Sequence, residues 1–193
     1  MIESTAGWIS WGGPLAAALA LGLGWVAYRV VRDPGRRTRG ALRRISPHLL
    51  SDVFVPDGVD GYVHVDHVLL ASGGVVVLDV RRYPGVIFGA EGIDQWTQVL
   101  ESGSYKFDNP LPELDWRVQI VQGLVGQVPV EGRLLFTAES RFPKGRPSRV
   151  VQLDSLAQDL GGMVTGRPVP PQWLEAWSAL RDSVRRGAAP SAG

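Results

Sequence analysis

The stretch from Gly61 to Gly89 constrains the fold of this chain more than any other part of the sequence. It contains two apolar runs, Tyr62–Ala71 and Val75–Val80, separated only by the turn residues Ser72-Gly73-Gly74. Glycine supplies the positive φ that a tight hairpin needs, so we expect two antiparallel strands joined by a short turn. Runs this apolar are typical of strands that are buried on both faces.

Each of the two expected strands carries one carboxylate. Asp66 lies on the first and Asp79 on the second, and burial of an unpaired acid is costly. One interpretation is that these acids lie at strand ends or pair with arginine. The other is a shared metal site, because side-chain alternation places Arg81 on the same face as Asp79. Hard cations such as magnesium prefer oxygen ligands and leave positions for phosphate and water.

The spacing of these residues resembles the pattern of the nuclease-related domain (NERD) family, a branch of the PD-(D/E)xK nucleases. The matching segments are Val65-Asp66-His67, Asp79-Val80-Arg81 and Arg82-Tyr83-Pro84-Gly85, followed by Gly89, Trp96 and Asn109-Pro110. The resemblance covers about residues 40–160. It implies an α/β fold of the restriction-endonuclease-like type, in which helices flank a central mixed β-sheet.

The same resemblance implies a divalent-metal-dependent phosphodiesterase that acts on nucleic acid. It assigns Asp66 and Asp79 as ligands of Mg²⁺ or Mn²⁺ and as catalytic residues, with Arg81 as the third catalytic residue. Arg81 stands where the family has a lysine. A guanidinium group, with a pKa above about 12, cannot act as a base, but it can bind a phosphate or stabilise the transition state.

Three further positions depart from the family's pattern. Ala41 stands where a metal-binding glutamate is usual, and Glu113 and Arg117 stand where a glutamine and a histidine are usual. Apolar residues recur at helical spacing over residues 113–128, which predicts an amphipathic helix. On that helix Glu113 and Arg117 form either a surface salt bridge worth about 0.2–0.5 kcal/mol or an added acid and a phosphate contact at the rim of the site.

Two more residues complete the candidate substrate-binding set of Glu113 and Arg117. Arg82 directly follows the catalytic arginine. His64 is expected on the same face as Asp66, where it either assists a metal or phosphate or serves as a hydrogen-bonded residue at the edge of the sheet. For His67 we expect the opposite face and a structural role.

The amino-terminal part of the chain has a different character. The 21 residues from Trp8 to Tyr28 carry no charge, and a helix of about 20 residues suffices to cross a bilayer. Aromatic residues lie towards both ends of this run, as they do at membrane interfaces. The sequence therefore predicts one transmembrane helix; the alternative is a buried core helix, although a long soluble helix normally shows a polar stripe.

Seven arginines follow this run, between residues 29 and 44. By the positive-inside rule they predict a single-pass protein of the cell membrane with its amino end outside and its remaining domain in the cytoplasm. They are also expected to attract anionic head groups, at about 1 kcal/mol per basic residue near the surface. Contact with a DNA backbone is a second interpretation of the same arginines.

Composition fits one domain with this appendage. The chain has 193 residues, of which 45% are hydrophobic and 20% charged, and its net charge of +1 gives no global basic field. The absence of cysteine excludes disulfides, thiol nucleophiles and cysteine-ligated zinc. We expect a short outer segment at 1–7, the span at 8–28, an arginine-rich juxtamembrane segment at 29–39, an α/β domain with a carboxy-terminal amphipathic helix at 40–186, and a disordered tail at 187–193.

Two functions from different classes remain open at this point. In the first, the chain is a membrane-anchored, metal-dependent enzyme that cleaves DNA or RNA at the cytoplasmic face. In the second, the nuclease fold has lost its chemistry and serves as a binding or scaffolding module at the membrane. The competence of the cluster formed by Asp66, Asp79 and Arg81 separates the two.

Overall fold

The computed structural model describes residues 34–164 and 166–187. The expected outer segment and the expected span at residues 8–28 lie outside the described residues, as do the first residues of the juxtamembrane segment. Within the described part of the chain, no helix is long and apolar enough to cross a membrane.

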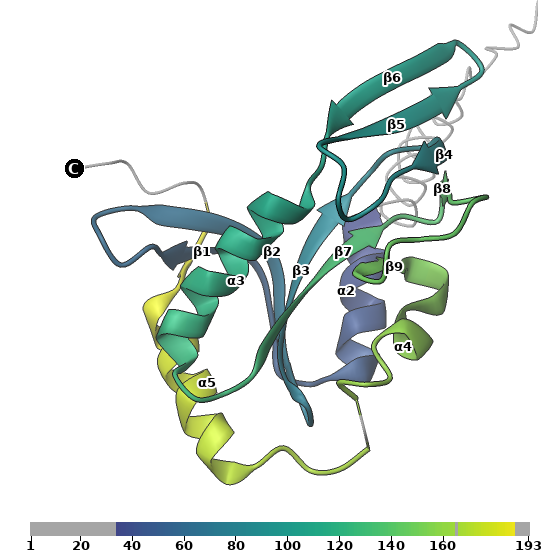
Figure 1. The fold of residues 1–193 in the computed structure, drawn as a ribbon. Helices are drawn as coiled ribbons and strands as arrows, with labels where there is room; N and C mark the ends of the chain where they lie inside the picture. Colours follow the sequence, from purple (N-terminus) through teal and green to yellow (C-terminus); the bar gives the residue numbers. More distant parts are fainter. Residues whose placement is uncertain (1–33, 165, 188–193) are drawn as a thin grey trace, which may run out of the picture. The chain divides into compact units, whose positions relative to one another are not determined.

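The described chain is a mixed α/β structure with two mixed sheets flanked by helices (Figure 1). The larger sheet contains, in spatial order, β10 (Arg185–Arg186), β1 (Leu49–Pro56), β2 (Tyr62–Ala71), β3 (Gly74–Arg81), β7 (Val130–Phe136) and β9 (Val150–Gln152). The smaller sheet contains β6 (Gly103–Asp108), β5 (Gln95–Leu100), β4 (Gly85–Phe88) and β8 (Ser140–Arg141). The helices are α2 (Pro34–Ile45), α3 (Leu111–Val125), α4 (Leu156–Asp159) and α5 (Pro171–Ser183), with a 3₁₀ turn at Leu153–Ser155.

The predicted hairpin is confirmed. β2 and β3 pair antiparallel from His67↔Leu78 to Ala71↔Gly74. Gly74 has a φ of 138°, and a Cβ there would lie 2.3 Å from the Pro129 carbonyl oxygen, so only glycine fits this turn. β7 then pairs parallel with β3, which makes the larger sheet mixed.

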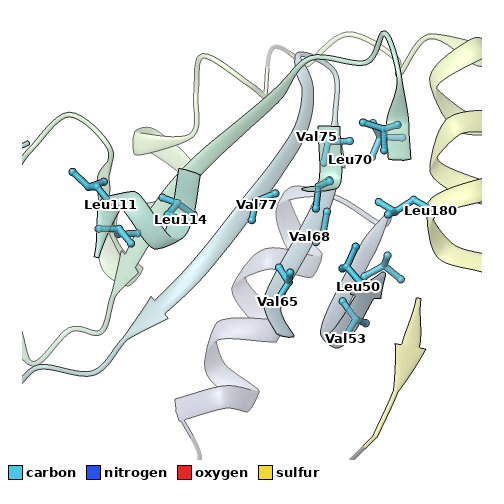
Figure 2. Packing of buried hydrophobic residues seen from close by; sticks show 14 of the residues in the cluster. Leu50, Val53, Val65, Val68, Leu70, Val75, Val77, Leu111, Leu114 and Leu180 are labelled. Atoms are coloured by element: carbon cyan, nitrogen blue, oxygen red, sulfur yellow. The ribbon is translucent and has the colours of Figure 1, made fainter. Parts of the chain in front are cut away.

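Two apolar clusters cover the two faces of the larger sheet. On one face, Val65 and Val77 pack with Leu114 of α3 and Leu180 of α5 (Figure 2). On the other face, Val76 and its neighbours pack with Leu42 of α2 and Leu160, which follows α4. Neighbouring residues of β3 thus serve opposite clusters, as alternation along a strand requires.

In β1 and β2 the alternation of side chains between the two faces of the sheet shifts by one residue at one level. Leu50 and Val53 belong to the same cluster although they are three residues apart, and so do Val65 and Val68. The ladder pairs Ser51↔His67 and Val53↔Val65, which leaves Asp52 opposite Asp66. Asp52 has a φ of 55°, a left-handed conformation that aspartate tolerates better than most residues. The shift in alternation therefore lies at the level where two aspartates occupy opposite positions in the ladder.

Candidate active site

The carboxylates of Asp66 and Asp79 lie at the point where the hairpin ladder stops. The last pair of the β2/β3 ladder on this side is His67↔Leu78, and the next residues along the two strands are the two aspartates. Asp66 Oδ2 accepts a hydrogen bond of 2.8 Å from the backbone N–H of Val80. The Asp66 carboxylate thus satisfies the Val80 amide in place of a backbone carbonyl of the neighbouring strand. In this position the Asp66 carboxyl lies within hydrogen-bonding reach of Asp79.

Asp79 is buried, with 5% of its surface exposed. Burial, together with the neighbouring Asp66, raises the pKa of its carboxyl to about 6 against the opposing effect of Arg81 and Arg117. Desolvation and a like charge both disfavour the ionised form. Two facing carboxylates in a buried place therefore need either a shared proton or a cation.

Two arginines hold Asp79 from the other side. Arg81 Nη2 donates to Asp79 Oδ2 and, at 2.8 Å, to Glu113 Oε2. Arg117 donates from Nη1 to the same Asp79 oxygen at 3.1 Å and from Nη2 to Glu113 Oε1 at 2.8 Å. Glu113 thus bridges both guanidinium groups, whose hydrogen bonds lower the pKa of its carboxyl. The expectation that Arg81 shares a face with Asp79 is confirmed by their direct contact.

Helix α3 brings Glu113 and Arg117 to the sheet. Asn109 Oδ1 accepts a hydrogen bond from the backbone N–H of Leu111, and Asn109 Nδ2 donates to the Ile93 carbonyl at 2.8 Å. The asparagine therefore fixes where the helix begins. Glu113 then lies in the first turn, where the helix dipole favours a carboxylate.

The pair Glu113 and Arg117 contacts the residues around Asp79. The Arg117 side chain is 14% exposed, and its Nε donates to the His64 carbonyl oxygen at 2.9 Å. An isolated surface salt bridge would leave this arginine in solvent. Of the two interpretations of the (i, i+4) spacing, the geometry favours the one that places both residues at the rim of the carboxylate pair.

The remaining candidate residues lie further from the carboxylate pair. The backbone carbonyl of His64 contacts Arg117, whereas its ring contacts Asp52 at 2.8 Å and packs near Phe54. Arg82 is exposed in the connection from β3 to β4. His67 is buried and its Nδ1 lies 2.9 Å from Ser51 Oγ.

The carboxylate pair has the donor chemistry that a hard divalent cation requires. Among residues 34–164 and 166–187, no group of three or more acidic or histidine side chains surrounds a common point, and Ala41 packs against the second apolar cluster. An ion here would therefore have two carboxylate ligands, with water, phosphate or main-chain oxygen completing its coordination. Such an ion would offset the burial and the like charge of Asp66, both of which raise the pKa of Asp79.

The structural roles of two residues, Asn109 beside the site and Asp52 on β1, are not predicted from the sequence. Asn109 enters only through the family resemblance, although an asparagine two residues before a helix is a local signal for an anchored start. No local signal predicts the left-handed conformation of Asp52 inside β1. That conformation accompanies the shift in alternation, which involves both β1 and β2.

A family model described as nuclease-related domain (NERD) matches residues 35–137, a range that contains every residue of the cluster. An uncharacterized protein of Bacillus anthracis is 28% identical over 82 residues, which are 42% of this chain and 39% of that protein. The match thus spans about two-fifths of that curated relative. No solved structure matches the chain.

The network predicts a large loss of stability when Arg117 is replaced by methionine. Arg117→Met leaves Asp79 with one partner and the His64 carbonyl without its donor, so we expect the free energy of unfolding to fall by about 3 kcal/mol. Arg181, which is exposed on α5, supplies the matched control, and Arg181→Met should change stability by less than about 0.5 kcal/mol. Urea unfolding followed by tryptophan fluorescence measures both, and equal small effects would contradict the network.

Proposed function

Because the chain belongs to the nuclease-related domain family, we propose that it hydrolyses phosphodiester bonds of nucleic acid at the cluster of Asp66, Asp79 and Arg81. One observation carries the proposal: two facing carboxylates lie next to two guanidinium groups in a partly buried place. Carboxylates suit a divalent cation and guanidinium groups suit a phosphate. The arrangement therefore matches the two charges that a metal-bound phosphodiester presents.

Asp66 and Asp79 would hold Mg²⁺ or Mn²⁺. When bound, such an ion neutralises charge on the scissile phosphate and lowers the pKa of a coordinated water. The hydrogen bond from the Val80 amide fixes the orientation of Asp66, so one ligand is positioned before the ion binds. Asp79 is fixed in the same way by Arg81 and Arg117.

Arg81 would bind the scissile phosphate and stabilise the charge that develops on it. Its guanidinium remains charged at any working pH, so it cannot accept the proton of the attacking water. In the described structure Arg81 and Arg117 both donate to Glu113, whose side chain is 50% exposed. A phosphate offers oxygens of the same kind, and it would compete with Glu113 for these donors.

A nuclease assay with matched variants tests this proposal. Purified protein is offered single- and double-stranded DNA and RNA with Mg²⁺ or Mn²⁺. We expect cleavage by the native chain, none by Asp66→Asn, and a loss of about 100-fold in Arg81→Gln, the size typical for one removed donor to a transition-state charge. Arg81→Lys, which keeps a positive charge, should retain more activity than Arg81→Gln.

Asp60 provides the control for this assay, because it is an exposed carboxylate in the turn between β1 and β2. Asp60→Asn should leave cleavage unchanged. Cleavage that persists in Asp66→Asn would show that the activity belongs to another site or to a contaminant. Absence of cleavage on all four substrates would contradict the enzymatic proposal and leave a binding module as the alternative.

We also propose that residues 8–28 anchor the chain in the cell membrane with its domain in the cytoplasm. The support is the uncharged run of 21 residues and the arginines that follow it. Leu21→Arg places a charge near the centre of the run, at a cost of about 3 kcal/mol for insertion. The native chain should remain with the membrane fraction after alkaline washing and the variant should be released; equal release of both would contradict the anchor.

A further inference from the structure

A second polar site lies outside the carboxylate cluster. A pocket of about 310 Å³ is lined by residues from three segments that are far apart in the sequence: Arg39 and Arg43 of α2, Leu49, Ser51 and Asp52 of β1, and Arg186 and Gly187 at the end of β10. Leu49 is the single apolar side chain in this lining. The pocket therefore suits a compact polar ligand.

Positive charge dominates this pocket. Arg39, Arg43 and Arg186 are exposed, and among the described residues their side chains have no hydrogen-bond or ion-pair partner. The lining contains one carboxylate, that of Asp52, whose Oδ1 already lies 2.8 Å from His64 Nε2. The described lining thus carries three arginines and one aspartate.

The floor of the pocket is held in place by two histidines. His64 contacts Asp52, and the Nδ1 of His67 lies 2.9 Å from Ser51 Oγ. The positive charge of the pocket comes from its arginines.

These features point to one ligand chemistry. Arginine presents a planar fork of donors that matches the oxygens of phosphate, and several arginines around one space favour a group with more than one negative charge. Arg39 and Arg43 are spaced (i, i+4), so both project from the same side of α2, while Arg186 approaches from another segment. We propose that this pocket binds a phosphate group.

The pocket is separate from the proposed active site. Helix α2 packs on one face of the larger sheet, where Leu42 belongs to the second apolar cluster. Helix α3, which carries Arg117, packs on the opposite face. Binding in the pocket therefore does not depend on the proposed nuclease chemistry or on a metal. The phosphate has two candidate sources: a phospholipid head group, because α2 follows the expected membrane span closely in sequence, or a soluble phosphate.

Calorimetric titration with inorganic phosphate tests the pocket directly. The full chain is kept in detergent at constant ionic strength and without divalent metal. We expect Arg43→Gln and Arg186→Gln each to weaken binding about tenfold, which corresponds to about 1.4 kcal/mol. Arg44→Gln is the matched control, because Arg44 is exposed on the same helix but does not line the pocket, and it should change the affinity less than twofold.

Two results would overturn the proposal. An equal loss in Arg44→Gln and Arg43→Gln would show that phosphate responds only to the general charge of α2. A loss in Arg81→Gln without one in Arg43→Gln would place the phosphate at the carboxylate cluster. Either result can occur whether or not the chain is a nuclease, so failure of the pocket is distinguishable from failure of the proposed function.

Vesicle sedimentation then identifies the source of the phosphate. Vesicles of phosphatidylcholine are compared with vesicles that also contain phosphatidic acid. If the head group is the ligand, Arg43→Gln reduces binding to the acidic vesicles more than Arg44→Gln does. If both variants bind the acidic vesicles equally while the titration separates them, the ligand of the pocket is a soluble phosphate.

Discussion

The buried carboxylate of Asp79 determines the arrangement of the groups around it. An ionised aspartate at this depth needs compensation, and the structure supplies it from Arg81 on the same strand and Arg117 on α3. The second carboxylate, Asp66, adds negative charge at the same place and raises the pKa of Asp79. The site thus contains two strong donors, Arg81 and Arg117, and one carboxylate, Asp66, beyond the buried one that pairs with them.

The apolar residues of the larger sheet compensate for the cost of burying these charges. Most of β2 and β3 is apolar and buried, so the polar groups are confined to the end of the ladder. The shift in alternation lies at Asp52 and Asp66. Asp66 belongs to the carboxylate pair and Asp52 lines the arginine pocket, so one irregularity in two neighbouring strands contributes a residue to each polar site.

Sequence alone predicted the hairpin and the helix after Asn109, and it placed Asp66 and Asp79 on the two strands of the hairpin. The reason is local: alternation and glycine turns fix strands, and helical periodicity fixes α3. It did not decide whether Glu113 and Arg117 form an isolated pair, because that depends on the distance from α3 to β3. The arginine pocket was also beyond prediction, since β10 and α2 meet only in the folded chain.

Manganese binding by calorimetry is the most direct measurement of the central claim that Asp66 and Asp79 form a cation site. The account predicts saturable binding by the native chain, at least about tenfold weaker binding in Asp66→Asn and Asp79→Asn, and native affinity in Asp60→Asn. If the native chain shows no saturable binding up to millimolar manganese, or if Asp66→Asn binds as tightly as the native chain, the two carboxylates do not form that site.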